Sequence, residues 1–283
     1  MSKTGTMTRG TEDILEQLRS HLPSFSPAER KIADVVLLDP IAVLSNSVTQ
    51  LASSADVSSA TVIRMCNAIG LRGFQDLKTQ IAIQHNPATG GEGGASEHPV
   101  AEILQESARA LLDAATVIDS DSVEKVAASL AKSRRIHVVA VGTSSMLASD
   151  FTYRLSMLGL HATFTSDVHA QHVQAKMLGP EDVLFAISHT GSTFETISAA
   201  RSAREAGARI IALTSFTRSP LTELCDAYVI AGSAETRVRV EAASSRLVHM
   251  AVLDTIQVIL SREVPGADES LKATAEVIAE HRY

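Results

Sequence analysis

Residues 136–145 read Ile-His-Val-Val-Ala-Val-Gly-Thr-Ser-Ser, an apolar run that ends at a glycine and three hydroxyl side chains. The run predicts a strand over Ile136–Val141, followed by a helix over about 146–158. A glycine and hydroxyls at a strand-to-helix turn can bind an anion, because unpaired N–H groups and the helix dipole converge there. The turn is not a GxGxxG fingerprint, since Ala140 stands where the first glycine would, and no Walker lysine follows. Taken alone, it fits an ordinary surface turn with a capping serine equally well.

Outward from this stretch, β-branched runs alternate with helical patterns. We expect amphipathic helices at about 101–117 and 121–133, and then strands at Ile136–Val141, Ala162–Thr165, Val183–Ser188, Arg209–Thr214 and Ala227–Ala231. Alternation at this spacing is typical of a parallel sheet with helices on both faces. The predicted fold class is therefore α/β: an N-terminal all-α domain and a doubly wound, five-stranded parallel sheet of the flavodoxin-like or Rossmann-like kind.

A second turn of the same kind follows the predicted strand Val183–Ser188. It reads His189-Thr190-Gly191-Ser192-Thr193, and a helix opens after it. The carboxyl ends of parallel strands share one edge of a sheet, and open α/β sheets bind ligands at that edge. Both turns lack Lys and Arg, so we expect N–H groups, hydroxyls and helix dipoles to hold a shared anion.

A change of composition divides the chain. Residues 86–99 carry four glycines and two prolines without a hydrophobic period, which predicts a flexible linker. We expect a helix-turn-helix domain over 1–85 and a ligand-binding α/β domain over 100–283. In the first part a helix is expected over Glu12–Leu22. Ser26, Pro27 and Glu29 then predict the capped start of the next helix.

Residues 51–67 have the pattern of a helix-turn-helix. Ala52 and Ala55 are small enough for a close helix crossing, Ser58 is a good N-cap, and Val62 and Met65 form an inward stripe. The opposite face is predicted to carry Ser59, Ala60, Thr61, Arg64 and Asn67. An αα-hairpin with a solvated polar face is the plainer reading, but the run resembles the helix-turn-helix of bacterial repressors almost position by position. Asp56 stands where glycine is usual, and aspartate tolerates the positive φ such a turn requires.

The charge distribution is compatible with DNA binding. The net charge of −7 arises after residue 85, because residues 1–85 carry eight basic and eight acidic side chains. Residues 57–75 contain two arginines and no acid, and local charge governs phosphate attraction.

The whole chain over about Glu12–Leu260 resembles the RpiR family of bacterial transcriptional regulators, in which a helix-turn-helix precedes a sugar isomerase (SIS) domain. The resemblance rests on the helix-turn-helix and on Pro27–Ala33, Gly73-Phe74 with Lys78, Gly142–Ser144, Ala148–Phe151, Ile187–Thr193 and Ser245–Leu247.

By this resemblance, Ser144, Ser188, Thr190 and Thr193 would hold the phosphate of a phosphorylated sugar or sugar acid. His169 and Gln171 would line the sugar end, and Glu241, Ser245 and Arg246 could reach the ligand from near a subunit contact. The complete set of candidate ligand residues is Gly142, Thr143, Ser144, Ser145, His169, Ser188, His189, Thr190, Gly191, Ser192, Thr193, Glu241 and Arg246. The candidate DNA-binding residues are Ser58 and Thr61 for phosphates, Ser59, Ala60, Arg64 and Asn67 on the groove face, and Arg72 and Lys78 for the backbone.

These observations favour a regulator that binds operator DNA and senses a phosphorylated sugar or sugar acid. A sugar-phosphate isomerase with an accessory helical domain is the alternative, with Glu195, Glu241, His169 and His189 as candidate bases. A third possibility is an α/β dimer whose helical part serves only in assembly. We expect no cofactor and no metal, because the HxxH at His169–His172 lacks a firm third ligand.

Further expectations concern location and assembly. The chain has no apolar run of the roughly 18–20 residues a membrane span needs, and its start is polar, so a cytoplasmic protein is expected. Cys66 and Cys225 are expected to be buried thiols. A homodimer, or a higher homo-oligomer, should prefer an inverted-repeat operator with half-sites about 34 Å or a multiple apart.

Overall fold

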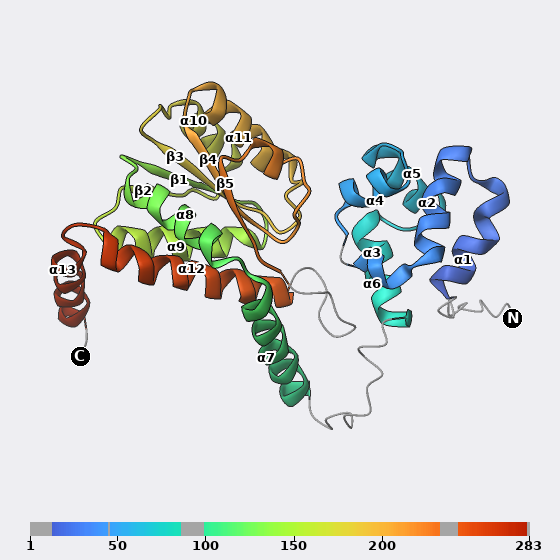
Figure 1. Ribbon diagram of the computed structural model, residues 1–283, viewed down its shortest axis with the longest axis horizontal. Coiled ribbons are helices and arrows are strands. Elements are labelled where there is room, and N and C mark those ends of the chain that lie inside the picture. Colours follow the sequence, from blue (N-terminus) through green and yellow to red (C-terminus); the bar gives the residue numbers. More distant parts are fainter. Residues whose placement is uncertain (1–12, 45, 86–98, 233–242, 282–283) are drawn as a thin grey trace, which may run out of the picture. The chain divides into compact units, whose positions relative to one another are not determined.

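The computed structural model describes residues 13–44, 46–85, 99–232 and 243–281. These residues form two compact units, a helical unit over 13–85 and an α/β unit over 99–232 and 243–281 (Figure 1). The predicted linker at 86–99 lies outside the described residues, apart from Pro99. Within the described ranges, no helix has both the length and the apolar character needed to cross a bilayer.

The helical unit is built from short helices around one apolar core. Its helices are α1 (Ile14–His21), α2 (Pro27–Leu38), α3 (Pro40–Leu44), α4 (Val48–Ser54), α5 (Ser59–Ala68) and α6 (Phe74–His85), with a 3-10 turn at Leu22–Ser24. The predicted capping signal at the start of α2 is confirmed, since Ser26 and Glu29 form a capping box and Pro27 is the first helical residue. The core contains Ile32, Val36 and Leu51, which are fully buried.

The described part of the second unit forms a five-stranded parallel sheet, as predicted. Its strands are β1 (Ile136–Val139), β2 (Ala162–Thr163), β3 (Val183–Ile187), β4 (Arg209–Thr214) and β5 (Ala227–Ile230), in the order β2-β1-β3-β4-β5. Its helices are α7 (Pro99–Val117), α8 (Ser120–Ala131), α9 (Ser144–Met157), α10 (Val168–Lys176), α11 (Phe194–Glu205), α12 (Ala243–Glu263) and α13 (Ala267–Glu280), with a 3-10 turn at Thr222–Leu224.

Helices cover both faces of this sheet (Figure 1). On one face α7, α8, α9 and α12 pack with Val138, Phe185 and Leu213, and on the other α10 and α11 pack with Val139 and Ala212. Successive strand residues therefore point into two different cores. This explains why the strands read as continuous apolar runs rather than as alternating ones.

Four of the predicted strands end one or two residues late. Val141, Thr165, Ser188 and Ala231 lie just beyond β1, β2, β3 and β5. Ser188 and Ala231 still donate their N–H groups to carbonyls of the β4 segment, at 3.1 and 2.8 Å. The apolar pattern thus continues into residues where the chain has already begun to leave the sheet.

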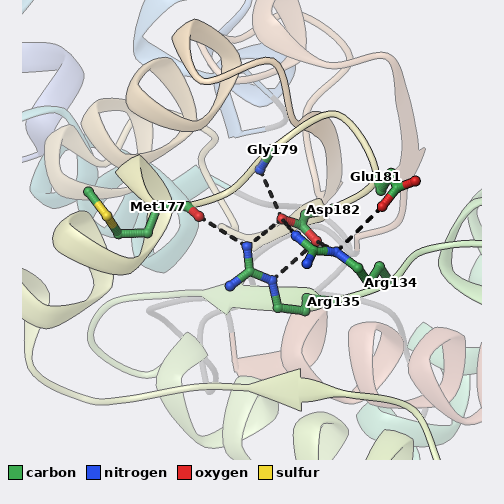
Figure 2. Close-up of polar contacts among 6 residues, drawn as sticks. All are labelled: Arg134, Arg135, Met177, Gly179, Glu181 and Asp182. Atoms are coloured by element: carbon green, nitrogen blue, oxygen red, sulfur yellow. Dashed lines mark hydrogen bonds and ion pairs between the residues drawn. The ribbon is translucent and has the colours of Figure 1, made fainter.

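A buried carboxylate joins the amino ends of β1 and β3 (Figure 2). The oxygens of Asp182 accept hydrogen bonds from Arg134 at 3.1 and 3.2 Å, from Arg135 at 2.6 and 3.2 Å, and from the N–H of Gly179 at 2.9 Å. These bonds, chiefly those from Arg135, lower the pKa of the Asp182 carboxyl to about 2. We call this cluster the Asp182 clasp, and it ties the residues before β1 to the residue before β3.

The two cysteines differ in exposure. Cys66 is buried in the helical core, as expected, whereas Cys225 is only partly buried. Burial is the main reason that the pKa of each thiol rises to about 12. Neither thiol is therefore a reactive thiolate at neutral pH.

Replacing Asp182 by Asn should destabilise the α/β unit by about 2 kcal/mol at neutral pH, because an amide cannot replace the ion pairs. The folded carboxyl has a lower pKa than the unfolded one, so its contribution is complete above about pH 4 to 5 and is lost as the pH falls through about 2. Urea unfolding between pH 7 and pH 2 would measure both effects.

Glu181→Gln is the matched control, because Glu181 is the neighbouring residue, is 79% exposed and lies 3.6 Å from Arg134. It should change the free energy of unfolding by less than about 0.5 kcal/mol. Equal stability of the two variants, with the same response to acid, would contradict a structural role for the clasp.

Candidate functional site

The order in which successive strands are added to the sheet reverses between β1 and β3: β2 lies on one side of β1, whereas β3, β4 and β5 lie on the other. Strands β1 and β3 are neighbours, with Val139 opposite Ala186. The helix after β1, α9, packs on one face, whereas the helix after β3, α11, packs on the other. In this strand order, the crevice at the carboxyl ends of the two strands is the place where ligands bind. The two hydroxyl-bearing turns identified in the sequence follow these two strands.

The first turn leads directly into α9. Gly142 has a φ of +63°, which favours glycine, and a Cβ there would meet nothing within 4 Å. The helix begins at Ser144, two residues earlier than predicted, so Ser144 and Ser145 lie in its first turn. Ser144 is mostly buried, and the Ser145 hydroxyl donates to Ala140 O at 3.2 Å. Thr143 is the N-cap, and its side chain forms no capping hydrogen bond.

The second turn leads into α11 and is held by its own hydroxyls. Ser188 Oγ accepts from the N–H of Gly191 at 3.2 Å and lies 3.3 Å from Thr193 Oγ1. Thr190 Oγ1 accepts from the N–H of Ser192 at 3.2 Å. Gly191 has a φ of +60°, and a Cβ there would collide with the Oγ of Ser219 in the segment after β4. This turn therefore requires glycine both for its backbone and for space.

The helices after the two turns share an unusual start. In α1, α2, α4, α5, α8 and α10 the N-cap side chain accepts a hydrogen bond from the first turn. The N-caps of α9 and α11, Thr143 and Thr193, make no such bond. In α9 the N–H of Ser145 still donates to Gly142 O at 3.1 Å. The other first-turn N–H groups of the two helices can donate to a ligand, and both helix dipoles favour an anion.

His189 lies in the second turn, but the protein itself holds its ring. Ser215 Oγ lies 2.8 Å from His189 Nδ1 and 3.1 Å from His249 Nε2, and the His189 ring packs edge-on against Phe216. His249 Nε2 lies 2.7 Å from Ala231 O, so it carries the proton and donates. Burial lowers the pKa of His249 to about 4, which keeps that ring neutral. The same N–H of His249 is shared with Ser215 Oγ at 3.1 Å, and the Ser215 hydroxyl forms its shorter hydrogen bond with His189 Nδ1.

The remaining predicted ligand residues differ in placement. His169 is exposed in the first turn of α10, and Arg246 is half-buried near the start of α12. Glu241 lies outside the described residues. The prediction that Gln171 lines the sugar end is wrong: it is buried, its Nε2 donates to Ala140 O and Thr165 O, and its Oε1 accepts from Ala140 N. Gln171 therefore braces the end of β1.

In the helical unit, α4, a short turn and α5 form the predicted pair of helices. Ala52 and Ala55 are buried at the crossing, and Val62 and Met65 face the core. Asp56 has a φ of +52°, the conformation expected of the residue that replaces glycine. Ser58 caps α5 by accepting from the N–H of Thr61 at 3.3 Å.

The exposed face of α5 contains most of the predicted DNA-binding residues. Ala60, Arg64 and Asn67 are exposed, Ser58 is exposed at the N-cap, and Ser59 is partly exposed. Thr61 departs from the expected outward position, since it is only 5% exposed and its Oγ1 accepts from Arg64 Nη2 at 2.9 Å. Its hydroxyl therefore orients Arg64, and its N–H group is used by the cap.

The two residues predicted to contact the DNA backbone differ in exposure. The Arg72 side chain is 93% exposed, at the turn before α6. The prediction for Lys78 is wrong, because this residue is only 2% exposed and its ammonium donates to Leu44 O at 3.0 Å and to Asn46 O at 3.4 Å. The sequence pattern of this helix is only weakly amphipathic, so Lys78 was predicted to be a surface cation. Instead its ammonium group forms hydrogen bonds to carbonyls near the end of α3.

Sequence reasoning missed two residues near this face. Lys31 of α2 pairs with Asp56 at 3.1 Å and so brings a cation beside the turn. Ile63 is 38% exposed among the outward residues of α5. A helical wheel centred on Ala60 and Asn67 would have shown Ile63 on the outer face.

Comparisons with known proteins agree with both units. Residues 12–87 match the helix-turn-helix domain of the rpiR family, and residues 129–259 match the SIS domain. An uncharacterised HTH-type transcriptional regulator of Caldanaerobacter subterraneus subsp. tengcongensis is 34% identical over 94% of this chain and 97% of its own length. Another, from Thermotoga maritima, is 29% identical over 96% of this chain and its whole length.

A solved structure also covers nearly the whole chain. The Vibrio vulnificus NanR protein complexed with ManNAc-6P has a TM-score of 0.78 and 28% identity, and it matches 95% of this chain and 99% of its own.

Gly191→Ala should destabilise the protein more than Gly142→Ala. Both alanines would adopt a left-handed φ near +60°, at a cost of about 1 to 2 kcal/mol. Only the alanine at 191 would collide with Ser219, which should add about 1–3 kcal/mol. Urea unfolding of the two variants measures the difference.

Ser219→Gly provides the check on the cause. If the collision is responsible, the double variant Gly191→Ala, Ser219→Gly should be more stable than the sum of the single effects predicts. Additive effects would contradict it.

Proposed function

Because the chain belongs to the RpiR family of HTH-type transcriptional regulators with a SIS domain, we propose that it binds operator DNA through α5 and senses a phosphorylated sugar or sugar acid. The effector would bind at the carboxyl ends of β1 and β3 and change the affinity for DNA. A coupling of this kind is typically worth about 1–3 kcal/mol.

The observation that carries the effector part is the pair of uncapped helix starts on adjacent strands. Their N–H groups, with the hydroxyls of Ser144, Thr190 and Thr193, form a donor set suited to a phosphate. The similarity to the NanR protein, which was solved in complex with ManNAc-6P, supports the same ligand class.

The observation that carries the DNA part is the outer face of α5. Arg64 and Asn67 carry hydrogen-bond donors for base edges. Arg72 is exposed in the turn that connects α5 to α6. The capped start of α5 is the part of a recognition helix that meets the groove.

We also propose that the protein acts as a homodimer. Along α7, Val100, Leu104 and Leu111 are exposed at helical spacing, on a helix that extends from the body of its unit (Figure 1). Their stripe leads into an apolar groove of 360 Å³ between α7, α8 and α12. A second copy covering this surface would remove it from water and would give the two-fold symmetry of an inverted repeat.

Binding without turnover is sufficient for this role. Of the candidate bases, Glu195 is exposed and His189 is held by Ser215. The two relatives described above are named HTH-type transcriptional regulators. The proposed division remains a DNA-binding domain over 1–85, a linker over 86–99 and an effector domain over 100–283, in a cytoplasmic protein that needs no cofactor.

A panel of phosphorylated sugars and sugar acids, including ManNAc-6P, should contain a ligand that stabilises the protein, whereas the unphosphorylated sugars should not. A ligand at 100 times its dissociation constant adds about 2.7 kcal/mol, which a thermal shift detects. Ser144→Ala should raise the dissociation constant at least about tenfold, because it removes a donor to a charged group. Thr116→Val, on the exposed surface of α7, is the control and should bind normally.

Two results would count against this part of the proposal. One is a panel in which phosphorylated and plain sugars behave alike. The other is conversion of a bound sugar phosphate into an isomer, which would favour the enzyme.

The DNA part predicts different effects for two arginines. With a duplex selected from a random pool, Arg64→Ala should cost about 1–3 kcal/mol and relax the preference at one base pair of each half-site. Arg72→Gln should weaken all duplexes alike and reduce the salt dependence of binding by about one phosphate contact. Fluorescence anisotropy over a range of salt concentrations measures both.

An inverted repeat should bind more tightly than a single half-site if the protein is dimeric. If the affinity for DNA depends neither on the DNA sequence nor on the salt concentration, the result would favour a protein whose helical domain serves only in assembly.

A further inference from the structure

The outer face of α5 carries a large apolar side chain that the proposed function does not explain. Ile63 is 38% exposed, although a β-branched apolar residue would usually face the core of such a small unit. The exposed large apolar residues of the described helical unit are Leu38, Ile41 and Ile63. Of these, Ile63 alone belongs to α5, and it lies beside the residues assigned to DNA.

The position of Ile63 follows from helical spacing. Val62, Met65 and Cys66 face the core, so the opposite side of α5 is formed by Ala60, Ile63, Arg64 and Asn67. Ile63 lies one turn before Asn67 and next to Arg64. The face is therefore a small apolar surface, formed by Ile63 and the methyl of Ala60, between hydrogen-bonding side chains.

This apolar surface is also held in place. An isoleucine in a helix has essentially one χ1 rotamer, so its branched end has a fixed direction. The Cδ1 of Ile63 lies 3.9 Å from where a Cβ on Gly73 would be, which places it against the turn before α6. Arg64 is turned toward the start of the helix by its bond to Thr61 Oγ1, and Ile63 keeps 38% of its surface exposed.

A DNA major groove offers a matching partner. Thymine presents a C5 methyl group there, among polar base edges, and apolar side chains contact it. A protein partner would instead need a wider apolar patch than one isoleucine and one alanine methyl. The polar neighbours of Ile63 are of the types that bind guanine and adenine, which again fits a groove floor.

We propose that Ile63, with the methyl of Ala60, reads the C5 methyl of a thymine in each operator half-site. This inference rests on the proposed DNA binding by α5. Residues 63 and 67 are about 6 Å apart along the helix, and base pairs are about 3.4 Å apart. The thymine should therefore lie about one or two base pairs from the position that Asn67 contacts.

Replacement of thymine by deoxyuridine tests the inference directly, because it removes only the methyl group. In the duplex selected from a random pool, each thymine is replaced in turn, and binding is measured by fluorescence anisotropy. Wild-type protein should lose about fourfold in affinity at one position of the half-site, the loss expected for one buried methyl group. Other positions should change little.

Protein variants assign this methyl to Ile63. Ile63→Ala should bind the thymine and deoxyuridine duplexes with equal affinity at that position. Ile63→Val keeps the branch and should retain most of the difference. Leu38→Ala is the control, because Leu38 is 86% exposed on α2 and should leave the difference unchanged.

The outcomes distinguish DNA binding by α5 from thymine recognition by Ile63. If no duplex is selected, the proposed DNA binding fails. If a duplex binds but no deoxyuridine replacement matters, or if the difference persists in Ile63→Ala, the assignment of Ile63 is overturned while DNA binding stands.

Discussion

The pairing of β1 with β3 is the constraint on which the candidate effector site depends. At the amino edge, the Asp182 clasp joins the segments that enter the two strands, and along the strands Ile136–Val139 pairs with Val183–Ala186. Because the strands are parallel and in this register, the turns at Gly142 and Gly191 emerge side by side at the other edge. The helices that follow pack on opposite faces, so both helix starts border the same crevice. A carboxylate at one end of the sheet thus helps to position the donors at the other end.

Much of this arrangement is readable from the sequence because it depends on local chemistry. Strand-helix alternation predicted the parallel sheet, and the capping residues Ser26 and Ser58 predicted the starts of α2 and α5. The positive φ of Asp56 followed from the turn that a helix-turn-helix requires. Each of these features is specified by residues close together in the chain. The expected ligand class and the roles of the site residues came from the resemblance to the RpiR family.

Two of the wrong predictions concern side chains whose partners are distant in sequence. Lys78 read as a surface cation, but it donates to Leu44 O, 34 residues earlier. Gln171 read as a ligand group, but it bonds Ala140 in the neighbouring strand segment. Ile63 was not included in the predicted outer face of α5, although it is 38% exposed there. A spacing rule states which face of a helix a residue occupies, whereas only the packing of the other helices decides whether that face is covered.

The two proposed binding surfaces use different physics. Neither turn of the effector site contains Lys or Arg, so its anion would be held by N–H groups and helix dipoles. These donors are fixed in the backbone and act over short range, so they stabilise a phosphate only at one position. Such a set selects a ligand by geometry. The DNA face uses arginines, whose contacts with phosphates release counterions, so the affinity for DNA depends on salt. The second turn of the effector site is also tied to the segment after β4. Gly191 O accepts a hydrogen bond from the N–H of Leu221, and Gly191 packs against Ser219. Any shift of the second turn on binding must therefore move the segment that follows β4.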